Sequence, residues 1–185
     1  MSRPRSALSV TSMSLLSVAL LLSIMAVLLP THPRAAQEDT LISFKIKDQF
    51  ERVHADEDYH GHVVVVIASG REGRKYSRLW TRAIKDSLED ESGFDDIRFL
   101  RVANMRGIPH FMREMVRGKL PKEKENWVLL DWEGEFAEAY QFEKGASNIF
   151  VFDRHGVLVH QTHGREPAQA ELGAVLAKLK SLMGD

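Results

Sequence analysis

Residues 63 to 67 form an unbroken run of four valines and one isoleucine, all of them apolar and β-branched. Such a run is typical of a strand that is buried on both faces of a parallel sheet. Residues 97–103 have the pattern of a second strand, and the segment between the two strands has apolar residues at helical spacing. These apolar positions are Tyr76, Leu79, Trp80, Ala83, Ile84 and Leu88. Residues 63–103 therefore predict one right-handed βαβ unit.

The remaining elements follow from the same periodicities. Phe44 and Ile46 alternate with Lys45 and Lys47, which indicates a half-buried strand. Gly156 sits where a tight hairpin turn needs a positive φ. The other predicted elements are a strand at 52–54, a short helix at 109–117, a solvated loop at 120–126, a strand at 127–131 with a short helix after it, a hairpin of 149–152 with 157–160, and a helix at 167–183.

The first 36 residues have the composition of an export leader. Arg3 and Arg5 precede an apolar run from Met13 to Leu29, and no charged residue occurs between Ser6 and Thr31. Cleavage after Ala36 would place Arg34 where a small residue is preferred, and the run is near the lower limit for crossing a bilayer. The leader is thus either a removed signal peptide or a retained inner-membrane anchor at residues 13–30. Both alternatives predict a periplasmic or other extracytoplasmic domain at residues 42–185, after a linker at 37–41.

Charge and cysteine content exclude several classes of function. Beyond residue 36 the chain carries 22 basic and 26 acidic side chains and no basic block, so we expect no nucleic-acid partner. Cysteine is absent from the whole chain. The domain therefore cannot form a disulfide, and its stability must come from core packing.

Two segments resemble one known fold. The segment FKIKDQFERVHADEDYHGHVVVVIAS resembles the entry of redoxins, and GASNIFVFDRHGVLV resembles their second hairpin. With the element order, these segments resemble the thioredoxin-like fold in its redoxin and TlpA-like form, over residues 42–183. The resemblance is closest to the YtfJ-like group of exported proteins. It implies an α/β three-layer sandwich with a mixed central sheet, an N-terminal β-hairpin and a central βα insertion.

The residues that carry redox chemistry in this fold are missing. Arg71 and Arg74 stand where redox-active relatives have their two cysteines, and Ser147 stands where they have a cis-proline. Thiol–disulfide exchange and thiol peroxidase chemistry both begin with a thiolate, so this chain alone cannot catalyse either. We predict no catalytic residue and no cofactor, and we expect a binding or scaffold module for a protein, a peptide or a small anion.

The candidate ligand-binding residues are those of the former redox surface: Arg71, Glu72, Gly73, Arg74 and Ser147. Backbone N–H groups at a helix start, together with an arginine fork, could bind an anion or a carboxylate. Alternatively, the arginines are solvated side chains that Glu72 compensates. Trp132 follows a predicted strand and is the candidate partner-facing aromatic residue, whereas Trp80 at helical spacing is typical of a core residue.

Histidines offer an alternative from another class, a metal-binding protein or metal-dependent enzyme of the cell envelope. One group of candidates is His54, His60 and His62 with nearby acidic residues, and another is His155, His160 and His163. Histidine and carboxylate ligands suit zinc or copper(II). However, no spacing fixes a ligand set, and the side chains of His160 and His163 would diverge at a strand end. We therefore predict no metal site.

Overall fold

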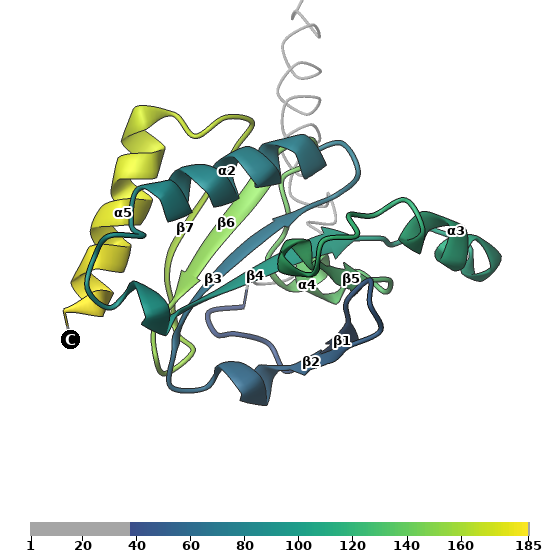
Figure 1. Ribbon diagram of the computed structural model, residues 1–185, viewed down its shortest axis with the longest axis horizontal. Coiled ribbons are helices and arrows are strands. Elements are labelled where there is room, and N and C mark those ends of the chain that lie inside the picture. Colours follow the sequence, from purple (N-terminus) through teal and green to yellow (C-terminus); the bar gives the residue numbers. More distant parts are fainter. Residues whose placement is uncertain (1–37, 185) are drawn as a thin grey trace, which may run out of the picture. The chain divides into compact units, whose positions relative to one another are not determined.

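The computed structural model describes residues 38–184 (Figure 1). The predicted leader lies outside these residues. The predicted βαβ unit is present: β3 (Val63–Ser69) and β4 (Ile97–Asn104) are parallel neighbours, and α2 (Arg74–Asp86) connects them. Every residue of β3 is buried, as its unbroken apolar sequence predicts for a central strand.

The main sheet has five strands in the order β5-β4-β3-β6-β7. Strand β5 (Leu129–Asp131) is parallel to β4, while β6 (Ser147–Phe152) is antiparallel to β3 and forms a hairpin with β7 (Leu158–Gly164). Gly156, in the turn of this hairpin, has φ +76°, which confirms the predicted conformation. The sheet is therefore mixed, with the βαβ unit at its centre.

Smaller elements complete the chain. Strands β1 (Lys45–Lys47) and β2 (Val53–Ala55) form a separate antiparallel hairpin. The other α-helices of the described part of the chain are α3 (Arg113–Arg117), α4 (Glu135–Ala139) and α5 (Gln169–Met183). Four 3-10 helices are also present in residues 38–184: η1 (Asp56–Tyr59), η2 (Phe94–Asp96), η3 (His110–Met112) and η4 (Lys124–Asn126).

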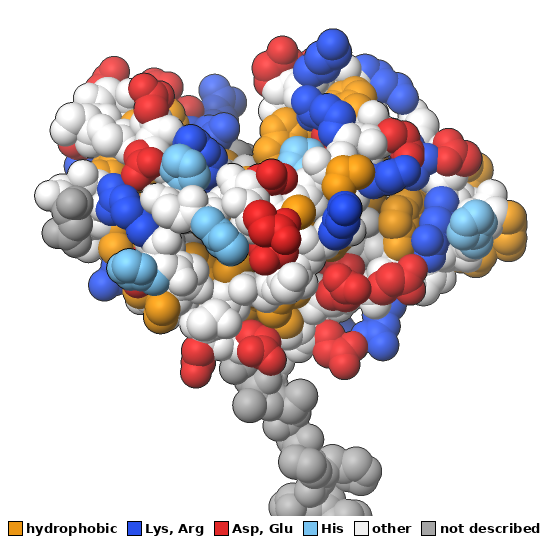
Figure 2. Space-filling model, turned by 90° about the horizontal axis from the view of Figure 1, so that it is seen from below, with side chains coloured by type: hydrophobic (Ala, Val, Ile, Leu, Met, Phe, Trp, Pro, Cys, Tyr) orange, Lys and Arg blue, Asp and Glu red, His pale blue; other side chains and the backbone are white. Residues whose placement is uncertain are grey.

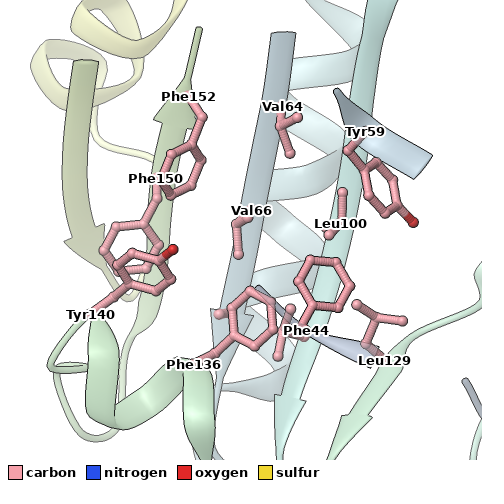
Figure 3. Packing of buried hydrophobic residues seen from close by; sticks show 12 residues of the cluster. Phe44, Tyr59, Val64, Val66, Leu100, Leu129, Phe136, Tyr140, Phe150 and Phe152 are labelled. Atoms are coloured by element: carbon pink, nitrogen blue, oxygen red, sulfur yellow. The ribbon is translucent and has the colours of Figure 1, made fainter. Parts of the chain in front are cut away.

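Each face of the sheet has its own apolar core. Helices α2 and α5 cover one face, where Trp80 and Ile84 pack against Val65 and Ile149. On the other face, Figure 3 shows aromatic side chains from α4 and the first hairpin region pointing toward β3, β4 and β6. These are Phe44, Phe136 and Tyr140, and they pack with Phe150 and Phe152 of β6. The domain thus has three layers: α2 and α5 form one, the main sheet lies in the middle, and α4 with the β1–β2 hairpin forms the third.

The segment before β1 is attached to the domain. Residues 38–41, part of the predicted linker, form backbone hydrogen bonds with Ala139, Gly156 and Leu158. The hydroxyl of Tyr140 donates to the Thr40 carbonyl and accepts from the Ile42 N–H, both at 2.8 Å. No helix in residues 38–184 is both long enough and apolar enough to cross a membrane.

Three details differ from the sequence predictions. Leu79 is 46% exposed, because the buried face of α2 is centred on Ser77, Trp80 and Ile84. Leu120, in the loop predicted to be solvated, is buried with Met105 and Leu130 in a small third cluster. Strand β7 continues to Gly164, so His163 lies inside the strand rather than at its end.

Candidate functional site

The turn before α2 is closed against the segment that precedes β6. Gly73 caps α2, and a Cβ atom at this position would lie 2.1 Å from the carbonyl oxygen of Ala146. Since real Cβ atoms do not approach a backbone oxygen so closely, only glycine fits here without moving the chain. Gly73 therefore has a packing role that its sequence context alone did not reveal.

Ser147 lies in the same contact. It is 0% exposed, and its Oγ lies 3.0 Å from the Oγ of Ser77 on α2. A buried hydroxyl needs such a partner because leaving it unpaired costs free energy. Its hydrogen bond to Ser77 thus joins the first strand of the second hairpin to α2, and the hydroxyl is directed into the protein.

The candidate arginines are separated. Arg71 and Glu72 line a hollow of about 580 Å³ with Asn104, Arg106 and Lys144. Arg74 lines a different cleft, which shares no lining residue with this hollow. The structure therefore does not bring Arg71, Arg74 and Ser147 together into one pocket.

The cleft that contains Arg74 has a volume of about 480 Å³ and lies between α2, β4 and the loop at 119–128. Its cationic side chains are Arg74, Arg78, Arg101, Lys119 and Lys122. Its apolar side chains include Ile67, Ala103, Leu120, Pro121 and Val128. Glu123 is the one acidic residue among the described residues that line it. We refer to this site as the basic cleft.

Arg101 is the most deeply placed cation of the basic cleft. It lies on β4, is half-buried, and donates a hydrogen bond from its guanidinium to the Trp127 carbonyl. Burial lowers the pKa of Arg101. Burial, and then the nearby charge of Arg101, lowers the pKa of Lys85 on α2, whose ammonium lies 4.8 Å from the ring centroid of Phe99. Positive charge is thus concentrated on this side of α2.

Among the described residues, the cations of the basic cleft have no acidic partners. Within residues 38–184, no carboxylate lies within ion-pair distance of Arg74, Arg78, Arg101, Lys119 or Lys122. Arg82, one turn further along α2, pairs instead with Asp86 at 3.4 Å. Arg74 and Arg78 are four residues apart on one helix, a spacing at which like charges repel. An anion bound in the cleft would relieve this repulsion.

Gln49 positions the outer wall of the basic cleft. This buried side chain lies in the turn between β1 and β2. Its amide nitrogen donates to the carbonyls of Pro121 and Asn126, and its amide oxygen accepts from the Val128 N–H at 2.8 Å. Donor and acceptor are both used, so neither a carboxylate nor an apolar side chain can replace this amide. The first hairpin therefore holds the loop that carries Lys119 and Lys122.

Trp132, the candidate partner-facing residue, is half-buried. The guanidinium carbon of Arg113 lies 4.9 Å from its ring centroid, and Arg113 also pairs with Glu133 at 3.0 Å. One ring face is thus occupied by an arginine from α3. Its role as a partner contact stays a prediction.

Among residues 38–184, the histidines are not grouped as metal ligands. His54 lies between Asp48 and Tyr59 and stacks on Trp127, while His62 binds Asp96 at 2.8 Å. Figure 2 shows the histidines of one face spread over the surface, not gathered at one point. In the part of the chain that the structure describes, no three His, Cys, Asp or Glu side chains are grouped as metal ligands. The metal-binding alternative therefore has no support.

Solved structures with the same arrangement of elements are numerous. The chain is similar to a protein of Chlorobium tepidum assigned as the thiol:disulfide interchange protein DsbE, with TM-score 0.56, 18% identity and coverage of 80% of this chain and 98% of that one. It is equally similar to a protein of Bacteroides thetaiotaomicron assigned as a protein disulfide isomerase, with TM-score 0.56, 15% identity and coverage of 81% and 91%. The chain has the thioredoxin-like fold.

A third structure with this thioredoxin-like fold is the exposed lipoprotein thioredoxin of Streptococcus pneumoniae, with TM-score 0.52, 22% identity and coverage of 76% of this chain and 100% of that one. No protein-family model and no curated protein matches the chain. The predicted fold class is confirmed, while the finer resemblance to the YtfJ-like group stays a prediction.

Most of the basic cleft escaped the sequence analysis, which singled out only Arg74. Arg78, Arg101, Lys119 and Lys122 come from three segments that only the thioredoxin-like fold brings together. One signal could have indicated part of the cleft. Arg74 and Arg78 have the spacing of one helix face, whereas Arg101 is only one of two arginines, with Arg98, in the predicted strand at 97–103.

Proposed function

We propose that this chain is an exported, non-redox thioredoxin-like module that binds an anionic ligand in its basic cleft. One observation carries the proposal: five cationic side chains line a cavity with a single carboxylate, and none of them has an acidic partner within the described residues. The volume, about 480 Å³, is within the usual range for small-molecule sites. Arginine guanidinium groups match carboxylates and phosphates geometrically, and so favour this ligand class.

Export is the second part of the proposal. It rests on the basic and apolar sequence of residues 1–36. Among the proteins with similar folds, the one from Streptococcus pneumoniae is an exposed lipoprotein, which is consistent with a position outside the cytoplasm. The absence of cysteine throughout the chain accounts for the non-redox character, since no thiolate can form.

The experiment is a thermal unfolding series with inorganic pyrophosphate. A ligand that binds only the folded state adds about 2.7 kcal/mol of stability at one hundred times its Kd, which raises Tm by several degrees. We expect this rise in the wild type and its loss in Arg78→Glu. Arg71→Glu is the matched control, because Arg71 lies outside the basic cleft but gives the same change of charge.

Two results would contradict the proposal. One is a wild-type Tm that pyrophosphate leaves unchanged over the millimolar range. The other is a response that Arg71→Glu abolishes and Arg78→Glu preserves, since it would place the anion in the turn before α2 instead of the cleft.

A further inference from the structure

The lining of the basic cleft is only partly charged, and this limits which anions suit it. Ile67, Ala103 and Val128 belong to strands or their flanks, while Leu120 and Pro121 come from the opposite wall. A water molecule occupies roughly 30 Å³ in the liquid, so an inorganic anion of a few such volumes fills a small part of about 480 Å³. The apolar lining would then remain in contact with water.

Charge sets the second limit. Five cations against one carboxylate leave a large positive excess, which a single negative charge would neutralise only in part. Arg101 is half-buried, so its unpaired charge is less well solvated than that of a surface arginine. A head group with two negative charges satisfies such a site better than a monoanion does.

From these two limits we infer that the basic cleft binds an amphiphilic dianion, an organic molecule with a doubly charged head such as a phosphate monoester and an apolar body. The head lies among Arg74, Arg78 and Arg101, and the body lies along the apolar lining. This inference rests on the proposed function, which requires only that the cleft bind an anion. It adds the chemical class of the ligand.

The test is an isothermal titration with methyl, ethyl, propyl and butyl phosphate on the chain as purified, with a protein-free titration subtracted. Each methylene that leaves water on binding tightens Kd by about fourfold, so butyl phosphate should bind up to about fiftyfold more tightly than methyl phosphate. Butyl sulfate, which has the same body and one charge, should bind on the order of tenfold more weakly than butyl phosphate.

Two variants test whether the dependence of affinity on alkyl length and head-group charge arises in the basic cleft. Arg78→Glu should abolish binding of the whole series. Val128→Thr keeps the shape of the side chain and the backbone bond to Gln49 but makes part of the lining polar. It should lower the ratio between butyl and methyl phosphate affinity several-fold while leaving methyl phosphate unchanged.

The outcomes separate the inference from the function on which it rests. Equal affinities along the alkyl series, with methyl phosphate bound and lost in Arg78→Glu, would overturn the inference and leave the anion site in place. Equal affinity for butyl sulfate and butyl phosphate would overturn the dianionic head. Failure of every member to bind would overturn the inference, and it would overturn the proposed function as well only if pyrophosphate also fails to bind. Binding that Arg78→Glu leaves unchanged would overturn both proposals.

Discussion

The two sides of the first turns of α2 use their polar groups in different ways. On one side, Gly73 and Ser77 meet Ala146 and Ser147 in a tight contact, at which Ser77 also borders the basic cleft. On the other side, Arg74 and Arg78 face an open cleft without acidic partners among the described residues. Both sides belong to the same helix and are separated by less than one turn in sequence.

This difference distinguishes structural from functional polar groups. Buried groups that satisfy one another, such as Ser77 and Ser147, stabilise the fold. Charged groups that line a cavity without partners destabilise the free protein slightly and gain from a ligand. The resemblance to redox proteins directed attention to the turn at residues 71–74, but the structure favours the cleft beside it.

We expect substitutions on the closed side to reduce the free energy of unfolding more than substitutions on the open side. Gly73→Ala would bring a Cβ to 2.1 Å from a backbone oxygen that cannot move alone, so we expect a loss of about 2–3 kcal/mol in the free energy of unfolding. Urea denaturation measures it. Gly70→Ala is the control, because nothing lies within 4 Å of a Cβ there, and it should change stability by less than about 0.5 kcal/mol. Equal effects at both positions would show that the contact with Ala146 is not tight.

The wall of the basic cleft depends on Gln49. Gln49→Ala removes three hydrogen bonds and leaves the partly buried Val128 N–H without its acceptor, at a cost of about 1–3 kcal/mol. It should also weaken pyrophosphate binding, because Lys119 and Lys122 lose their fixed positions. Calorimetric titration at a temperature where the variant is folded measures this effect. Unchanged affinity would mean that the loop keeps its place without the first hairpin.

Asp48, in the same hairpin, should make the stability of the protein depend on pH in the acid range. Burial alone would raise the pKa of Asp48, but hydrogen bonds from Arg52, His54 and the backbone outweigh it and lower the pKa below 3.8. The stabilisation that Asp48 provides is therefore complete above about pH 4 and is lost as the pH falls through its folded-state pKa. Urea unfolding between pH 2.5 and 7 should show a shallower acid slope in Asp48→Asn than in the wild type. Parallel curves would contradict this assignment.

Sequence reasoning captured the fold because its signals are local. The β-branched run of β3, the glycine of the second hairpin and the alternation in β1 each fix one element, and the order of the elements then permits few topologies. The wrong prediction that Leu79 lies on the buried face shows the limit of this reasoning. Its helical spacing fits a buried face, but the direction of that face is set by where α2 lies on the sheet.

The site was less predictable than the fold. The sequence makes Gly73 a candidate ligand-binding residue because of its place in the turn. Its packing role, however, comes from the contact with Ala146, which is more than seventy residues away. Similarly, the basic cleft combines side chains from α2, β4 and the loop at 119–128. Sequence spacing can indicate that Arg74 and Arg78 share a helix face, but only tertiary packing brings the partners from the different segments together.

A smaller effect concerns the pair of serines. Ser77→Ala or Ser147→Ala alone leaves one buried hydroxyl unpaired, whereas the double variant removes both groups. We expect the double variant to be more stable than the sum of the single effects predicts, with a coupling of about 1 kcal/mol. A double-mutant cycle by urea denaturation measures this coupling. Strict additivity would mean that the two hydroxyls do not interact.

The smallest expected effect belongs to the open side. Arg78→Glu should change the free energy of unfolding by less than about 0.5 kcal/mol in the absence of ligand, because Arg78 is exposed and unpaired among the described residues. Thermal unfolding without added anion measures it. A large loss of stability would make Arg78 a structural residue, in contradiction with the comparison between the two sides of α2.

The most direct test is to locate a bound anion by NMR. Backbone amide shifts of the isotope-labelled protein would be followed during addition of pyrophosphate. The account predicts that the amide resonances of Arg74, Arg78, Arg101 and residues 119–123 shift together along one saturating curve. The amide resonances of Arg71, Glu72 and Gly145 should not shift. Saturating shifts centred on Arg71 and Gly145, or no saturating shift at all, would contradict the assignment of the basic cleft as the binding site.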